Sequence, residues 1–488
     1  MNPTMSNRNF LSERMCYLFL FLTAFFIRLP FFFRDYIDRD ESTFILMGQS
    51  IADGYLPYVQ LWDLKPPLLF YVFGLIQYIF PDSFVAIRFL GVLVVFLSAV
   101  ILMKISVKAR LKNGFLTGLL YVILSSEFGN LQGLMSEHLA VLFVLAAMYF
   151  LHKKELSLYF FLSGIAFGCA LLCKLSLAYG IFLYLLASFI MDLGTRSFRR
   201  LLISYFQAAA GILLPFAFLL TPYLLQDKGE LFINSVFLAP LEYSKAGYLS
   251  PLQKLANTWW IIAAGLLIAY FSLSRLRQGF KRTTILILSL LIGVIYTFYS
   301  SGIVNGHYLV QVYPFMLLLV FGILIKKEIL LKPVVLGLLV VLVSAESLIE
   351  YYKVGKSIVH TGSPYYREAF TITRLIKDRK PDVQKIFFAD YHIGYWLLNQ
   401  YPLTKSTTHP SNLARPFLFK YFGVERNSLE ELQFLMDSIQ PDVVVSKTER
   451  LGFFPFNSSE NIYFDSVIQK DFRPMMQPGK HVWIWERK

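Results

Sequence analysis

Charged residues are scarce in this sequence. Only 16% of its 488 residues are Asp, Glu, Lys or Arg, whereas 56% are hydrophobic. A soluble chain of ordinary composition carries about 25% charged residues. Apolar windows of about 18 to 25 residues recur, which is the length that crosses about 30 Å of hydrocarbon. The composition therefore excludes an ordinary soluble protein and predicts a polytopic membrane protein.

Cysteine is also rare, and several familiar motifs are missing. Cys16, Cys169 and Cys173 all lie in apolar runs, so no disulfide framework is expected. We find no glycine-rich phosphate loop that would bind a soluble nucleotide, no low-complexity tract and no clear internal repeat. The first apolar run lacks a small-residue cleavage site and contains Arg28, which predicts an uncleaved first span rather than a signal peptide.

The apolar runs predict eleven membrane spans. We expect them near 15–33, 84–103, 113–127, 138–151, 156–173, 175–191, 202–225, 256–274, 283–300, 307–325 and 333–349. The net charge is +14, but the basic residues form short clusters between spans. Such clusters are typical of topology signals and of contact with anionic membrane lipids rather than with nucleic acid. The positive-inside rule then predicts a cytoplasmic N-terminus and an extracytoplasmic C-terminus.

One apolar segment, 66–80, is too short for this scheme to count as a span. It has 15 residues, fewer than the usual 17 or more, and a crossing there would reverse every later basic cluster. We therefore predict a helix that lies at the outer interface or dips back, with Pro66 and Pro67 in its first turn.

The character of the chain changes near residue 350. We expect a transmembrane module over 1–350, with a first extracytoplasmic loop over 34–83, and a small extracytoplasmic α/β domain over 351–488. In that domain "VQKIFFAD", "PDVVVSK" and "HVWIWERK" read as strands and "SLEELQFLMDSIQ" as an amphipathic helix.

Charged groups beside a bilayer are expensive to keep and are functional candidates for that reason. Asp38, Asp40 and Glu41 follow the first span directly. Asp40 could cap the next helix and Glu41 could complement its dipole. Alternatively, Asp40 is a general base for an acceptor hydroxyl, and Asp38 and Asp40 together are a candidate site for a divalent cation.

Lys65 favours the functional alternative. It precedes Pro66 and Pro67 at a helix start, where the dipole disfavours a cation but favours an anion. A phosphate bound between Lys65 and the free N–H groups at the helix start would pair with the lysine and would also be the anion that the helix dipole favours. Snorkelling of the lysine to the interface is the other explanation.

The order of these motifs resembles a known family. An Arg in the first span, "DE" after it, "GYLPY" and then "DLKPPLLFY" are similar to motifs of the GT-C membrane glycosyltransferases, in the branch that holds protein O-mannosyltransferases and the lipid A aminoarabinose transferase. "SGIAFGCALLCKLSLAYG", "GHYLVQVYP" and the tail continue the resemblance over nearly the whole chain. The motifs are short, and their order makes them specific.

The resemblance implies a bacterial cytoplasmic-membrane enzyme that moves a sugar from a polyprenyl-phosphate donor to a hydroxyl of a glycan, lipid or protein, with inversion. It implies that Asp40 is the general base, Glu41 its partner and Lys65 a ligand of the donor phosphate. Glu137, with neighbouring His138, matches a second acidic position. The aminoarabinose branch has an arginine shortly after its acidic pair, where Ser42, Thr43 and Phe44 stand here, so Arg28, Lys174 or His307 would supply that phosphate contact.

Other candidates and other functions stay open at this stage. His307 could bind phosphate or fill its own hydrogen bonds with a neighbour. His392 and His409 show no ligand spacing, and structural roles are favoured. A transporter or flippase of lipid-linked glycans, a polysaccharide polymerase or ligase, and a non-catalytic assembly protein are the alternatives to a glycosyltransferase.

Overall fold

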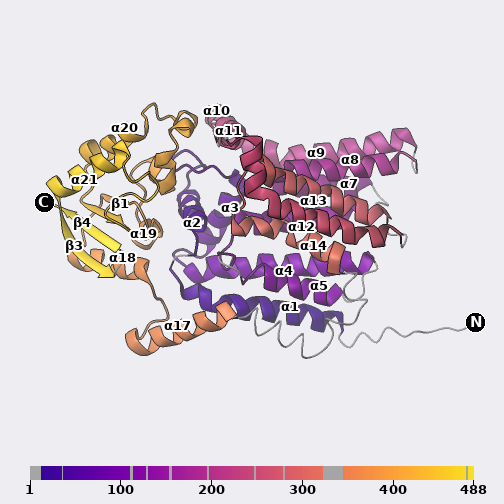
Figure 1. The fold of residues 1–488 in the computed structure, drawn as a ribbon, viewed down its shortest axis with the longest axis horizontal. Helices are drawn as coiled ribbons and strands as arrows, with labels where there is room; N and C mark the ends of the chain where they lie inside the picture. The colour runs from indigo at the N-terminus through magenta and orange to yellow at the C-terminus, as the bar shows by residue number, and fades with distance from the viewer. Residues whose placement is uncertain are drawn as a thin grey trace, which may run out of the picture.

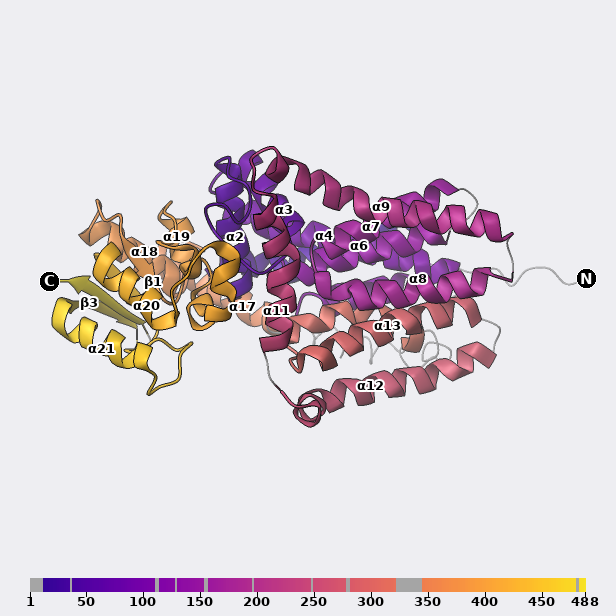
Figure 2. The same cartoon turned by 90° about the horizontal axis from the view of Figure 1, so that it is seen from above.

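The computed structural model describes residues 12–488 except 36, 110–113, 128–129, 153–156, 195–196, 247–248, 278–280, 322–344 and 480–481. A bundle of roughly aligned helices forms one end of the molecule, and a mixed helix and strand region forms the other (Figures 1 and 2). We call residues 368–488 the α/β region. The part of the predicted eleventh span over 333–344 lies outside the described residues.

The first half of the described chain is helical. Its elements are α1 (Glu13–Arg28), the 3₁₀ turn η1 (Leu29–Phe33), α2 (Arg39–Ala52), α3 (Pro67–Ile79), α4 (Phe84–Lys108), α5 (Gly114–Leu124), α6 (Ser136–Leu151), α7 (Ser157–Leu171), η2 (Leu175–Leu177), α8 (Ala178–Asp192) and α9 (Phe198–Leu224).

Helices continue up to the α/β region. They are α10 (Gly229–Ile233), η3 (Asn234–Leu238), α11 (Ala239–Ala246), α12 (Pro251–Arg277), α13 (Lys281–Ser301), η4 (Gly306–Gln311), α14 (Tyr313–Met316), η5 (Leu317–Phe321) and α17 (Ala345–Thr361).

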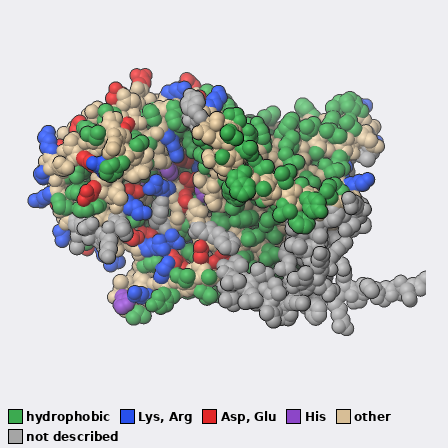
Figure 3. All heavy atoms as spheres, in the orientation of Figure 1, with side chains coloured by type: hydrophobic (Ala, Val, Ile, Leu, Met, Phe, Trp, Pro, Cys, Tyr) green, Lys and Arg blue, Asp and Glu red, His purple; other side chains and the backbone are tan. Residues whose placement is uncertain are grey.

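The predicted polytopic helical fold is confirmed. Within the described residues, six helical segments are long and apolar enough to cross a membrane: Glu13–Phe33, Phe84–Lys108, Leu175–Asp192, Phe198–Leu224, Pro251–Leu273 and Lys281–Ser301. The expected spans at 113–127, 138–151 and 156–173 correspond to the shorter apolar helices α5, α6 and α7. Hydrophobic side chains cover the visible face of the bundle, whereas charged side chains are more frequent on the α/β region (Figure 3).

Helix α3 is short, as the sequence indicates. It has 13 residues and Pro66 at its N-cap, so at 1.5 Å per residue it extends only about 20 Å, less than the hydrocarbon thickness. Helix α3 packs instead against α2 at the end of the bundle that faces the α/β region (Figure 2). It brings Lys65, just before its first turn, to that end of the bundle.

Helix α2 is enclosed by its surroundings. Ten consecutive residues, Glu41 to Ser50, are buried. On the side of the α/β region, Arg39 forms an ion pair with Asp390 at 3.0 Å, Thr43 Oγ1 lies 3.0 Å from His392 Nε2, and Gln49 Nε2 donates to Asn399 at 3.0 Å. The helix that carries the predicted acidic pair is therefore held by both parts of the molecule.

The α/β region contains a four-stranded sheet in the order β1-β2-β4-β3. β1 (Ile386–Phe388) and β2 (Val443–Ser446) are parallel, and β4 (Val482–Arg487) is antiparallel to β2 and to β3 (Phe472–Gly479). The three strands expected from the sequence are confirmed, and β3 was not expected. The other elements are α18 (Glu368–Arg379), α19 (Ile393–Leu397), η8 (Lys405–Thr407), η9 (Pro410–Ala414), η10 (Pro416–Phe422), α20 (Ser428–Gln433), η11 (Phe434–Ile439) and α21 (Ser459–Asp471).

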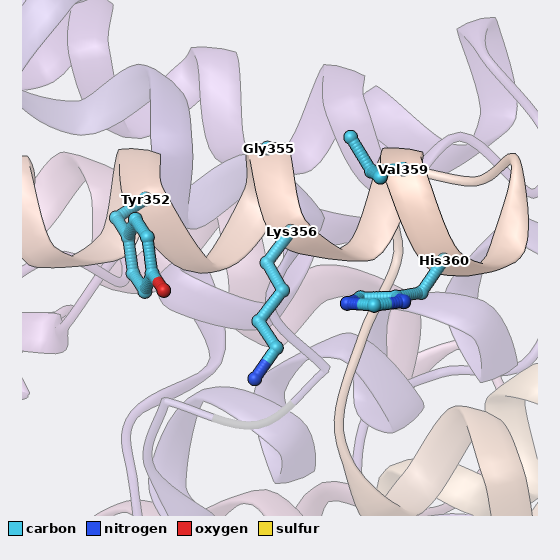
Figure 4. A pocket seen from close by; sticks show the side chains of 5 residues that line it. All are labelled: Tyr352, Gly355, Lys356, Val359 and His360. Atoms are coloured by element: carbon cyan, nitrogen blue, oxygen red, sulfur yellow. The ribbon is translucent and has the colours of Figure 1, made fainter.

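Helix α17 runs through the junction expected at 350/351. It leads toward the α/β region beside the bundle (Figure 1). One face carries a shallow depression lined by Tyr352, Gly355, Lys356, Val359 and His360, with the three long side chains pointing outward (Figure 4). The continuous helix gives no sharp boundary between the two predicted domains, and the division at 350/351 stays a prediction.

Glycines allow a close contact between helices α7 and α9. A Cβ on Gly164 would lie 2.1 Å from the carbonyl oxygen of Ala208, and a Cβ on Gly211 would lie 2.3 Å from that of Phe161. These are backbone atoms, so a side chain fits only if the helices separate. Small residues at helix contacts are the usual means of close packing in membranes.

We expect Gly164→Val to destabilise the protein by about 1–3 kcal/mol, because the added methyl groups overpack this contact. Gly194→Val is the matched control, since nothing lies within 4 Å of a Cβ built there. Thermal unfolding in detergent measures both variants. Equal midpoints for Gly164→Val and the wild type would show that the close helix contact contributes nothing.

Candidate active site

Asp40 and Lys65 form an ion pair across the two ends of one loop. Lys65 Nζ lies 2.7 Å from Asp40 Oδ2, and the side chains are 18% and 22% exposed. The backbone N–H of Lys65 donates to Asp63 Oδ2 at 3.2 Å, and Tyr58 Oη donates to the Lys65 carbonyl at 2.7 Å. These bonds fix the chain on either side of the Lys65 side chain, so the ammonium is aimed at the start of α2.

A second acid–lysine pair lies close to the first. Lys174 Nζ contacts Glu137 Oε1 at 2.5 Å, and Ser136 Oγ donates to the other oxygen of Glu137 at 2.9 Å. Lys174 also lies 4.3 Å above the ring of Tyr308. Lys65 and Glu137 interact electrostatically, which places the two pairs in one neighbourhood.

His307 lies in the same neighbourhood and has an unused ring nitrogen. Its Nδ1 accepts a hydrogen bond from Asn130 Nδ2 at 3.1 Å, whereas its Nε2 is buried and has no hydrogen-bond partner among the described residues. His307 interacts electrostatically with both Asp40 and Glu137. A buried polar atom without a partner is costly, and a ligand that contacts Nε2 would remove that cost.

His409 completes the group from the α/β region. Its Nε2 lies 3.5 Å from Asp40 Oδ1, and its Nδ1 lies 2.7 Å from Ser411 Oγ. We name this set the acid–lysine cluster; its members are Asp40, Lys65, Glu137, Lys174, His307 and His409. The sequence suggested a structural role for His409, because nothing in its local spacing points to a contact so far away in the chain.

Glu41 and Arg28 have different surroundings from the acid–lysine cluster. Glu41 is 1% exposed, pairs with Arg88 at 2.9 Å and accepts the backbone N–H of Leu134 at 2.8 Å. The Arg28 guanidinium donates to the carbonyls of residues 125, 131, 132 and 133 at 2.8–3.2 Å. Both side chains hold the loop before α6, which leaves the roles predicted for them in catalysis and phosphate binding without geometric support. Sequence reasoning also overlooked Arg88.

His138 and Asp38 are likewise engaged within the fold. His138 Nδ1 accepts the backbone N–H of Met135 at 3.1 Å, and its Nε2 lies 3.0 Å from the carbonyl of Ser125. Asp38 is the N-cap of α2 and accepts from the backbone N–H of Asp40 at 2.8 Å. The expectation that Asp40 is the cap is therefore wrong: Asp38 caps the helix, and Asp40 lies in its first turn with a side chain that does not cap.

The Asp38 and Asp40 pair does not fit a divalent cation in this arrangement. Asp38 Oδ1 and Oδ2 accept from the Asp40 backbone and from Asn130 Nδ2, while Lys65 and His409 face the oxygens of Asp40. In the part of the chain that the structure describes, no group of three or more His, Cys, Asp or Glu side chains is arranged to hold a metal. We derive no step through a metal ion.

The charges around Asp40 decide its protonation state. Burial by itself would raise the pKa of Asp40, but the Lys65 ammonium and the His409 imidazole outweigh it and hold that pKa well below its usual value. Burial likewise opposes the charge on Lys65, and the Asp40 carboxylate reverses this and raises the pKa of Lys65. The carboxylate is therefore ionised but weakly basic as long as Lys65 stays on it.

Comparisons with known proteins bear on the family and the fold. A family model for dolichyl-phosphate-mannose-protein mannosyltransferase matches residues 64–222, and no curated protein sequence matches the chain. The structure is similar to ArnT from Cupriavidus metallidurans bound to undecaprenyl phosphate, with 14% identity, 97% of both chains covered and a TM-score of 0.61. Apo ArnT gives 14% identity, coverage of 97% of this chain and 98% of ArnT, and a TM-score of 0.58.

A shorter match is found with the Pmt1-Pmt2 protein O-mannosyltransferase complex of S. cerevisiae bound to the sugar donor. It has 18% identity, a TM-score of 0.36, and covers 46% of this chain and 35% of the yeast chain. The overlap is too small to establish a shared architecture.

The family match covers residues 64–222, less than half of the chain. The likeness to ArnT covers nearly the whole chain and shows an ArnT-like fold, and the chain also has a small C-terminal sheet. The resemblance seen in the sequence is thus confirmed at the level of the fold.

We expect Arg88→Met to reduce stability by about 3–5 kcal/mol, because it leaves the buried Glu41 carboxylate without its cation. The double variant Glu41→Gln/Arg88→Met should recover part of that loss, since neither buried charge remains. Unfolding in detergent at neutral pH measures both. A double variant less stable than Arg88→Met would contradict a structural ion pair.

Proposed function

We propose that the protein transfers a sugar from a polyprenyl-phosphate-linked donor to a hydroxyl group of a cell-envelope glycan, lipid or protein, with inversion at the anomeric carbon. The observation that carries this proposal is the acid–lysine cluster. It offers two carboxylates in the first turns of helices, two ammonium groups and a buried imidazole with a free nitrogen among the described residues. A sugar phosphate presents matching chemistry: an anion, and a carbon that a deprotonated hydroxyl can attack.

The proposed reaction is a single displacement. Asp40 takes the proton of the acceptor hydroxyl, whose oxygen forms a bond to the anomeric carbon as the bond from that carbon to the phosphate oxygen breaks. The electron pair leaves with the polyprenyl phosphate. Lys65, Lys174 and His307 stabilise the negative charge that develops on the departing phosphate. Attack in line with the leaving group inverts the anomeric centre.

The ion pair implies an order of events. While Lys65 contacts Asp40, the low pKa of Asp40 makes it a poor base. A donor phosphate competes with the carboxylate for Lys65, because its two non-bridging oxygens share a negative charge that grows as the bond to the anomeric carbon breaks. Once Lys65 turns to the phosphate, Asp40 loses its nearest cation and becomes more basic. The base would therefore become active only when the donor is bound.

An apolar groove on the bundle suits a lipid donor. It lies between α12, α13 and the η4–α14 segment and has a volume of about 170 Å³, with walls that include Trp260, Ile268, Leu309 and Met316. His307 belongs to the same element, η4, as Leu309. A polar phosphate site and an apolar groove thus share one short segment, as a ligand with a charged head and a hydrocarbon chain requires.

We further propose that the cluster and the α/β region face the extracytoplasmic side of a bacterial cytoplasmic membrane, with the N-terminus inside. Basic residues support this orientation: Arg14 lies at the start of α1, Lys108 ends α4, Arg199 lies in the first turn of α9 and Lys281 begins α13. Those helix ends are the ones remote from the α/β region (Figures 1 and 2). Positive charge is enriched on the cytoplasmic side of membrane proteins.

The charges also argue against a transporter. Transporters commonly bind substrate near the bilayer midplane between repeated halves. Here the charged pairs come from helix starts and loops at the end of the bundle facing the α/β region. An interfacial reaction explains that placement directly.

Asp40→Asn should leave expression and unfolding near normal and lower sugar transfer at least about 100-fold, because the amide cannot accept the acceptor's proton. The assay incubates purified protein with a panel of polyprenyl-phosphate sugars and measures release of polyprenyl phosphate. If no donor in the panel is turned over by the wild type, or if the variant keeps near-normal activity, the assignment fails.

Lys65→Ala should mainly weaken donor use. Loss of a charge-assisted bond to phosphate is expected to raise the KM for the donor about 10- to 100-fold. Lys356→Ala, on the exposed face of α17, is the matched control and should keep the wild-type KM. A Lys65→Ala variant with unchanged donor KM would remove Lys65 from the phosphate site.

A further inference from the structure

The α/β region reaches into the reaction site through a single side chain, His409. This residue is 7% exposed and is the N-cap of η9. It contacts Asp40 through Nε2 and Ser411 through Nδ1. His409 is the one member of the acid–lysine cluster that the transmembrane bundle does not supply.

The backbone around His409 is anchored to the loop that carries Lys65. The neighbouring Thr408 accepts the backbone N–H of Trp62 at 3.3 Å through Oγ1. The Trp62 ring packs on Phe422 with centroids 4.6 Å apart, and its Nε1 donates to Ser235 at 3.0 Å. These bonds hold His409 at a fixed distance from the loop between α2 and α3, so its contact with Asp40 is part of a built interface.

The hydrogen bond of Ser411 bears on the tautomer of His409. When Ser411 Oγ donates to Nδ1, the ring proton resides on Nε2 and points at Asp40 Oδ1. The imidazole then engages one oxygen of the carboxylate. Lys65 engages the other, Oδ2.

Few other charges face His409 in the described part of the chain. From α2 these are Asp40 and, one residue away, Arg39, which is paired with Asp390. Lys65 affects His409 through Asp40, the carboxylate that both side chains contact. The ring of His392 lies 5.8 Å away. Burial is the largest cause that holds the pKa of His392 well below its usual value, and His409 and Arg39 lower that pKa further. The His392 ring is therefore neutral. Asp40 is therefore the acidic side chain with which His409 interacts in the cluster.

We propose that His409 is a positioning residue for Asp40 in sugar transfer, one that holds Oδ1 of the carboxylate while Lys65 leaves Oδ2 for the donor phosphate. This inference rests on the proposed function. With Lys65 on the phosphate, the contact between His409 Nε2 and Oδ1, 3.5 Å long in the free protein, is what keeps the carboxylate in its orientation. Oδ2, free of the lysine, then points its lone pair at the acceptor hydroxyl. The α/β region thus takes part in catalysis by fixing the base.

The proposal also predicts which side chain can replace the histidine. Glutamine at position 409 carries a side-chain amide that can donate an N–H to the Asp40 carboxylate, whereas alanine has no donor.

Two substitutions separate positioning from a purely structural role. His409→Ala should lower kcat about 10- to 100-fold, the value of a hydrogen bond to a charged group, and leave the KM for the polyprenyl-phosphate sugar within about twofold. His409→Gln should recover most of the kcat, because its side-chain amide can donate an N–H to Asp40. His360→Ala, in the exposed depression on α17, is the control and should match the wild type in kcat.

The outcomes are distinguishable even where a variant folds poorly. If His409→Ala does not fold, His409→Gln decides, and a folded His409→Gln with a kcat more than about 100-fold below that of the wild type overturns the proposal. A folded His409→Ala with wild-type kcat overturns it as well. If the wild type turns over no donor, the proposed function fails, and the contact is tested separately by ¹⁵N NMR of labelled histidines. The His409 imidazole shifts should change in Asp40→Asn, and unchanged shifts would contradict the contact.

Discussion

The ion pair between Asp40 and Lys65 is the interaction on which the rest of the site depends. A carboxylate at the edge of a bilayer is costly unless a cation compensates it, and the loop between α2 and α3 brings Lys65 to the first turn of α2. In the free protein this contact compensates the charge of Asp40. A phosphate that competes for Lys65 therefore changes the basicity of the acid at the same time.

Local patterns in the sequence were enough to predict much of this architecture. The long apolar runs predicted the helices, and short segments rich in apolar residues predicted β1, β2 and β4. Strand β3 was missed because Pro474 and Pro478 count against a strand, and they are tolerated because β3 lies at the edge of the sheet, where a missing N–H costs little. The Asp40 and Lys65 pair was anticipated from charge near the membrane. His409 was not, because its contact is tertiary and no local spacing encodes it.

Arg28 and Glu41, which the same reasoning from charge assigned to the site, have partners within the fold, and their predicted roles stay predictions. A buried charge near a membrane invites a functional assignment, but such a charge can also be compensated inside the protein. Carbonyl groups of the loop before α6 take the donors of Arg28, and Arg88 with the Leu134 backbone takes the oxygens of Glu41. Neither partner set can be read from the sequence, because loop carbonyls leave no side-chain signal. Charged and polar groups in such a protein therefore divide into those already satisfied and those, such as His307 Nε2, that can still accept a ligand.

Helix α2 lies between the bundle and the α/β region, with ten consecutive buried residues, and this has a consequence for how such proteins can diverge. A tail that only recruited acceptors could be exchanged between homologues as an independent module. Here the α/β region packs against α2, the helix that carries Asp40, through Asp390, His392 and Asn399. New acceptor preferences are therefore expected to arise by changes in the loops around this contact, because replacing the whole region would remove the contacts that hold α2.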